Sequence, residues 1–192
     1  MTTTKRFRFG FLSLILFLSS AITAQIVSPF SVRYQTNAKG GIKFVSNVVL
    51  SCPNSNNCTT AKNEVPPSGS FANGDFNMSY VDIDNDATTF MSSSDSIALP
   101  NCSEILWAGL YWSARIAANT ANYANRSQVK FKVNNSAYQT LTADQTINST
   151  TGYQSYFCFK NVTSIVQGAG IKARFTLADM FCWTGVSNLA GG

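Results

Sequence analysis

Apolar and polar residues alternate along much of the chain after about residue 30, a pattern typical of β-strands. The clearest example is the segment 128–133, where Val129, Phe131 and Val133 alternate with Lys130 and Lys132. Similar patterns predict strands over residues 30–35, 42–50, 76–83, 97–99, 138–141, 153–159 and 171–183. Turn residues at 37–41 separate the first two segments and therefore predict a hairpin.

One segment, 105–112, is apolar at every position, which predicts a central strand with both faces covered. Residues 52–74 are rich in Pro, Asn, Ser and Gly and predict a long surface loop, whereas 161–167 predicts one short helix that ends at Gly168. About nine strands without a strand–helix rhythm predict an all-β fold. We expect an antiparallel β-sandwich, jelly-roll or immunoglobulin-like, with long irregular loops.

The first 24 residues have the layout of a secretory signal peptide. Lys5, Arg6 and Arg8 precede an apolar run over residues 9–18, and small or polar residues then lead to Ala24. The run is too short for a membrane helix of about 20 residues. We therefore expect cleavage before Gln25, export of a soluble chain, and a single domain over residues 25–192. A retained N-terminal anchor is the alternative.

The composition of the chain excludes several kinds of catalytic and metal site. Charged residues make up only 12 % of the chain, and histidine is absent. The missing histidine excludes Ser-His-Asp and Cys-His catalysis and every metal site with a His ligand. Without residues 1–24, which hold three basic residues and no acid, eleven basic residues face nine acidic ones. That small net charge argues against nucleic-acid binding.

Five cysteines, all beyond residue 24, predict disulfides in an exported protein. Cys52 and Cys58 bracket a short polar loop, which a local bridge between them would close. Cys158 and Cys182 lie in two strand-like runs, and adjacent strands would bring them together. Cys102 is then left without a partner in the chain.

Asp82, Asp84 and Asp86 are spaced so that their carboxylates project to one side of an extended chain. Three such oxygen donors suit Ca²⁺, which makes this cluster the candidate metal site and Ca²⁺ the candidate cofactor. The pattern then departs from a calcium loop, because Ala87 replaces the glycine and Ser93 the bidentate glutamate. A solvated acidic edge that deters strand pairing is the alternative.

The three aromatic residues of the strongest strand, Trp107, Tyr111 and Trp112, have two interpretations. They form either a platform that stacks on sugar rings or a part of the core, and an unbroken apolar strand favours the core. Hydrolysis by paired carboxylates is the enzyme hypothesis that is compatible with the missing histidine, yet nothing in the sequence marks Glu64 or Glu104 as having a raised pKa. The sequence therefore predicts no catalytic residue.

Five segments carry a family resemblance: Val81-Asp82-Ile83-Asp84, Thr89-Phe90-Met91-Ser92-Ser93-Ser94, Leu99-Pro100, Trp107-Ala108-Gly109-Leu110-Tyr111-Trp112 and Phe159-Lys160-Asn161-Val162-Thr163. Over roughly residues 30–192 they resemble the N-terminal module of large secreted, adhesin-like surface proteins of Bacteroidetes. In that family Asp stands where Asn161 stands here. The resemblance implies export by the type IX route, as for proteins linked to gliding motility and attachment.

Two functions follow as expectations. The first is a non-enzymatic, exported cell-surface or adhesin module with a structural or attachment role, whose partners are surface or outer-membrane proteins. The second is a carbohydrate-binding module, alone or attached to a secreted hydrolase, with surface glycans as partners. We also expect the chain to be the N-terminal part of a longer protein. No nucleic acid is expected as a partner.

Overall fold

The computed structural model describes residues 31–52, 56–63, 73–117, 119–149 and 155–186. The chain divides into two compact units, Met1–Ser31 and Val32–Gly192. The predicted signal peptide over residues 1–24 and its cleavage site lie outside the described residues. The description that follows therefore concerns the second unit.

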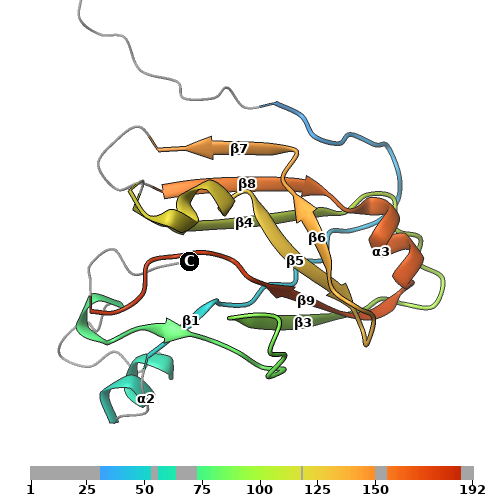
Figure 1. The fold of residues 1–192 in the computed structure, drawn as a ribbon. Coiled ribbons are helices and arrows are strands. Elements are labelled where there is room, and N and C mark those ends of the chain that lie inside the picture. Colours follow the sequence, from blue (N-terminus) through green and yellow to red (C-terminus); the bar gives the residue numbers. More distant parts are fainter. Residues whose placement is uncertain (1–30, 53–55, 64–72, 118, 150–154, 187–192) are drawn as a thin grey trace, which may run out of the picture. The chain divides into compact units, whose positions relative to one another are not determined.

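The larger sheet has four antiparallel strands in the order β3-β9-β5-β6 (Figure 1). They span Ser92–Ala98 (β3), Lys172–Ala178 (β9), Gln128–Val133 (β5) and Gln139–Thr142 (β6). Val129 and Phe131 are buried, whereas Lys130 and Lys132 project from the other face, because successive side chains of a strand point in opposite directions. This confirms the alternation predicted from the sequence.

The smaller sheet has three antiparallel strands in the order β4-β8-β7. They span Gly109–Arg115 (β4), Ser155–Asn161 (β8) and Gln145–Asn148 (β7). In β4, Trp112 is buried and Tyr111 is exposed. The prediction that both faces of this strand are covered is therefore wrong. The strand also begins at Gly109, four residues later than expected, and among the described residues it lies at an edge of its sheet.

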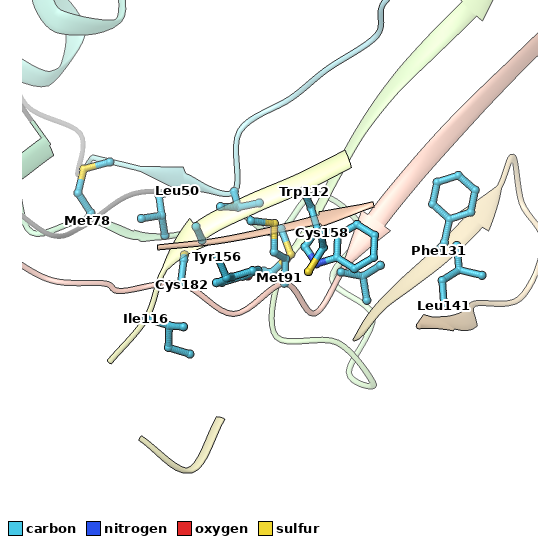
Figure 2. Packing of buried hydrophobic residues seen from close by; sticks show 14 of the residues in the cluster. Leu50, Met78, Met91, Trp112, Ile116, Phe131, Leu141, Tyr156, Cys158 and Cys182 are labelled. Carbon is cyan, nitrogen blue, oxygen red and sulfur yellow. The ribbon is translucent and has the colours of Figure 1, made fainter. Parts of the chain in front are cut away.

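The inner faces of the two sheets contribute to one buried hydrophobic cluster (Figure 2). Val129 and Phe131 come from the larger sheet, and Trp112 and Tyr156 come from the smaller one. Burial of one such large side chain contributes about 1.5–3 kcal/mol. The fold is thus all-β, antiparallel and sandwich-like, as the sequence predicts.

Two seven-residue α-helices accompany the strands. Thr163–Ala169 (α3) confirms the predicted short helix, displaced by two residues toward the C-terminus. Asn56–Lys62 (α2) lies in the segment 52–74, for which the sequence predicts only a loop. Two short 3₁₀ helices, Asn73–Asp75 and Ala121–Asn125, complete the helical elements of the described chain.

The predicted N-terminal hairpin does not form. No strand lies within residues 31–49, and the first one, Leu50–Ser51 (β1), pairs with Ser79–Tyr80 (β2), all that forms of the strand expected over 76–83. Ile42 and Phe44 are 83 % and 82 % exposed. Alternation alone cannot make a strand, because a strand also needs an edge to pair with.

No helix in the described part of the chain is both long enough and apolar enough to cross a membrane.

Candidate functional site

The outer face of the smaller sheet carries exposed aromatic side chains. Tyr111 of β4 lies opposite Phe159 of β8, and Phe157 is two residues from Phe159 along the same strand. Paired residues of antiparallel strands share a face, so all three project away from buried Trp112. Tyr111 is 59 % exposed and Phe157 is 53 % exposed. Two large rings on a hydrogen-bonded sheet are thus open to solvent.

Further rings extend this group into a row. Trp107 stacks on Phe159, with ring centroids 6.2 Å apart and an interplanar angle of 14°. Tyr34 stacks on Trp107 in turn, at 5.9 Å and 14°. Tyr111 contacts Phe159 with centroids 5.0 Å apart. We call Tyr34, Trp107, Tyr111, Phe157 and Phe159 the aromatic face.

Polar groups lie within this face. The Arg33 guanidinium carbon is 3.9 Å from the centroid of the Phe159 ring, a cation–π contact. Arg33 Nη2 also donates a hydrogen bond to Gln145 Oε1, and Gln145 lies opposite Phe159 in the register of β7 and β8. Stacked rings beside amide and guanidinium groups can hold a ligand that has both apolar and polar surfaces.

Gly109 keeps the row closely packed. A Cβ atom at this position would lie 2.5 Å from Cη2 of Trp107 and 3.0 Å from Cε2 of Phe159. Both distances are below van der Waals contact, so any side chain here would displace Trp107. The glycine thus allows the indole ring to lie directly over the start of β4.

The structure divides the three aromatic residues of the predicted platform between two places. Trp112 is in the core, 4 % exposed, and its Nε1 donates a hydrogen bond to the Arg126 carbonyl at 3.1 Å. Tyr111 and half-buried Trp107 belong to the aromatic face. The core interpretation is therefore right for Trp112, whereas Tyr111 and Trp107 are not part of the buried cluster. Stacking of these two rings on sugars stays a prediction.

Residues 82–86, which include Asp82, Asp84 and Asp86 and which we call the acidic turn, are held in place by one buried hydroxyl, that of Ser92. Ser92 Oγ lies 2.7 Å from Asp82 Oδ1 and 2.8 Å from Asp84 Oδ1. It also accepts hydrogen bonds from the backbone amides of Ile83 and Asp84, at 2.9 and 3.3 Å. Ser92 thus holds the acidic turn against the start of β3.

Asp84 has a cationic partner from the protein itself. Its Oδ2 lies 2.5 Å from Lys132 Nζ and accepts a hydrogen bond from the Tyr138 hydroxyl at 2.6 Å. Burial raises the pKa of the Asp84 carboxyl, but the hydrogen bonds from Lys132, Tyr138 and Ser92 outweigh burial and hold the pKa well below its usual range. Asp84 is therefore ionised at neutral pH.

Asp86 serves a different purpose from Asp84. Its Oδ1 accepts hydrogen bonds from the amide and hydroxyl of Thr88, at 2.9 and 2.7 Å. The described residues contain no group of three or more Cys, Asp or Glu side chains that could hold a metal ion. The expected convergence of Asp82, Asp84 and Asp86 on one cation is therefore not found. Calcium binding there stays a prediction, and it requires Ca²⁺ to replace Lys132 at Asp84.

The cysteines confirm one pairing and correct another. Cys52 and Cys58 form a disulfide, with Cα atoms 5.8 Å apart, as predicted. Cys158 and Cys182 are both buried and free, so their predicted pairing is wrong in this structure. The reason is topological: Cys158 lies in β8 of the smaller sheet, whereas Cys182 follows β9 of the larger one, so the two strands are not adjacent.

The free thiols are poor nucleophiles where they are buried. Burial raises the pKa of the Cys182 thiol to about 12 and also raises that of Cys158. Cys102 is free and exposed. The buried thiols at positions 158 and 182 therefore act as small apolar groups of the core.

Buried Tyr156 and half-buried Tyr80 anchor the chain after β9. The Tyr156 hydroxyl donates to the Phe181 carbonyl at 2.6 Å, and that of Tyr80 donates to the Cys182 carbonyl at 3.0 Å. Burial raises the pKa of Tyr80 to about 12 and raises that of Tyr156 further. Both hydroxyls remain protonated donors, so their role is structural.

Sequence reasoning missed Tyr34, Phe157 and Arg33 as members of the site. The sequence pattern places Arg33 and Tyr34 in a strand of the predicted hairpin. It places Phe157 in a strand without indicating which side of that strand faces the core. A signal was present in the 155–161 segment, where Tyr156 and Cys158 alternate with two phenylalanines. When apolar residues occupy both the odd and the even positions of a strand, both faces of its sheet carry apolar side chains, including the outer one.

Comparison with known proteins found no family model, no curated protein and no solved structure that matches this chain.

Proposed function

We propose that this chain is a non-enzymatic attachment module of an exported protein and acts at the cell surface. The observation that carries the proposal is the aromatic face on the outer side of the smaller sheet. A soluble domain rarely exposes large contiguous apolar groups without a binding role. Tyr111 and Phe157, each more than half exposed, are the residues through which contact is made.

The chemistry of the chain supports a binding role over a catalytic one. The sequence contains no histidine. The carboxylate with the most strongly perturbed pKa in the described chain, Asp84, is already paired with Lys132. The buried thiols and tyrosines have raised pKa values, the direction opposite to that of an activated nucleophile.

A second candidate, carbohydrate binding, is favoured by the geometry of the row. Tyr34, Trp107 and Phe159 form a stack with interplanar angles of 14°, in which Phe159 is covered (8 % exposed) and Tyr34 is open to solvent (42 % exposed). Flat aromatic surfaces suit the apolar faces of sugar rings, and Arg33 and Gln145 offer hydrogen bonds to sugar hydroxyls. The attachment target is then a surface glycan.

The attachment proposal is tested with the full chain, expressed with its leader, collected from the medium and fluorescently labelled. We expect it to bind intact Bacteroidetes cells in flow cytometry, and the variant Tyr111→Ser/Phe157→Ser to lose most of that binding. Ile42→Ser/Phe44→Ser is the matched control, because these side chains are also highly exposed and apolar. Absence of wild-type binding, or equal loss in both variants, contradicts the proposal.

The carbohydrate candidate is tested on an array of neutral polysaccharides with the same three proteins. Binding by the wild type and the control, but not by Tyr111→Ser/Phe157→Ser, supports it. Binding to cells without binding to any neutral polysaccharide contradicts the carbohydrate candidate for the aromatic face.

A further inference from the structure

A second surface, on the larger sheet, gathers hydrogen-bond donors around a hollow. A depression of about 470 Å³ is lined by Ser96 of β3, Asn134 and Asn135 after β5, and Lys172 and Arg174 of β9. In the register of β3 and β9, Ser96 lies opposite Arg174. Lys172 is two residues from Arg174 on the same face. Both basic side chains are exposed.

Two aspartates neutralise the lysines of β5, whereas Lys172 and Arg174 form no ion pair with any described residue. Lys132 is bound to Asp84, and Lys130 to Asp179 at 2.9 Å. No ion pair among the described residues includes Lys172 or Arg174. Two like charges so close together repel each other, so an anion between them would lower the energy of this surface.

The one carboxylate of the adjacent strand β3, that of Asp95, does not pair with Lys172 or Arg174. Asp95 lies opposite Phe175 in the register, and its carboxylate accepts hydrogen bonds from the amides of Ser46 and Ser96, at 3.0 and 2.7 Å. Residues opposite Phe175 share the inward-facing side of the sheet, where Phe175 packs against the core. The Asp95 side chain therefore projects from the face of the sheet opposite to that of Lys172 and Arg174.

Asn134 adds a fixed donor. It has a left-handed backbone (φ 51°), its amide donates to the Arg174 carbonyl at 2.8 Å, and its Oδ1 accepts from the Arg174 amide at 2.9 Å. With Oδ1 occupied, the Nδ2 group is available as a donor. The depression thus combines an ammonium, a guanidinium, amide donors and the Ser96 hydroxyl.

We propose that this depression binds the carboxylate of an acidic polysaccharide, with Lys172 and Arg174 as the anion-binding residues. A guanidinium binds a carboxylate through two parallel hydrogen bonds, and hydroxyl and amide groups nearby suit the hydroxyls of the same sugar ring. No aromatic side chain lines the depression, which disfavours single-stranded nucleic acid, whose bases stack on aromatic rings. The site is separate from the aromatic face and does not depend on the function proposed for it.

The test is affinity electrophoresis of the full exported chain in native gels that contain polygalacturonate, with neutral dextran as the blank. We expect polygalacturonate to retard the wild type. Lys172→Gln/Arg174→Gln should weaken binding at least about tenfold, because two charge-assisted contacts are lost. Lys39→Gln/Lys43→Gln, which removes two exposed lysines elsewhere, is the control with the same change in charge. It should bind like the wild type.

The proposal is overturned by no retardation of the wild type, by equal loss in both double variants, or by stronger retardation by single-stranded DNA through the same two residues. Arg174→Lys separates a specific site from a general basic surface, since it keeps the charge and loses the bidentate geometry. Binding that is weaker than that of the wild type supports the site, and unchanged binding contradicts it. Thermal melting of each variant verifies the fold.

Discussion

At the scale of single residues, two adjacent buried serines of β3 have opposite environments. The Ser92 hydroxyl contacts two carboxylates and two backbone amides of the acidic turn. The Ser93 hydroxyl is buried without a hydrogen-bond partner. A buried polar group without a partner costs about 1–3 kcal/mol, whereas a satisfied one stabilises the fold.

Alanine at each position should therefore change stability in opposite directions. Ser92→Ala should lower the free energy of unfolding by about 1–3 kcal/mol, because it leaves groups of the acidic turn unpaired. Ser93→Ala should raise it by about 1 kcal/mol, since it removes an unsatisfied hydroxyl. Urea denaturation measures both, and each variant serves as the other's control. A loss of stability in Ser93→Ala would show that its hydroxyl has a partner.

The ion pair of Asp84 should make stability depend on pH. The lowered pKa of Asp84 in the folded chain means that its contribution is fully present above the unfolded pKa, about 3.9, and is lost as the pH falls below it. Asp84→Asn should thus be less stable than the wild type at neutral pH, by about 1–3 kcal/mol.

Urea denaturation from pH 7 down to acid conditions measures this prediction. The difference between wild type and Asp84→Asn should be constant near neutrality and shrink below about pH 4. Glu104→Gln, which removes one exposed carboxylate, is the control for the same change in charge. A wild-type advantage that persists in acid would mean that the charge of Asp84 is not what stabilises the turn.

At the scale of elements, the sequence predicts the strands with strict alternation best. The predicted strand 128–133 has the same bounds as β5. The bounds of the predicted helix 161–167 differ by two residues from those of α3. β7 was not predicted, because Gln145–Asn148 holds only one large apolar residue. For the segment 105–112 the sequence predicts a strand that begins too early. The apolar residues before Gly109 do not belong to β4, and Trp107 among them contributes to the aromatic face.

Gly109 is the residue on which the geometry of the aromatic face depends at this scale. Gly109→Ala should displace Trp107 and lower the free energy of unfolding by about 1–3 kcal/mol, as overpacking usually does. Thermal melting and the Trp fluorescence spectrum measure these effects together. Gly168→Ala is the matched control, because a Cβ there contacts nothing within 4 Å. An unchanged spectrum in Gly109→Ala would mean that Trp107 does not lie over this glycine.

At the scale of the whole molecule, the sequence predicts the all-β class but not which surfaces remain free. Two stacked antiparallel sheets follow from strand patterns, because each sheet must cover one apolar face. The partners of each strand depend on contacts between residues distant in sequence. The predictions of an N-terminal hairpin and of a Cys158–Cys182 bridge are wrong for this reason. The aromatic face depends on the same information, since only the register shows that Tyr111 and Phe157 share one side.

Hydroxyl-radical footprinting of the full chain, free and bound to cells, tests the central proposal that the aromatic face is the attachment surface. We predict strong labelling of Tyr111 and Phe157 in the free chain, protection of both after attachment, and little labelling of buried Trp112 in either state. Labelling of exposed Phe44 should stay unchanged and serves as the internal reference. Weak labelling of Tyr111 and Phe157 in the free chain, or equal labelling in both states, would contradict the account.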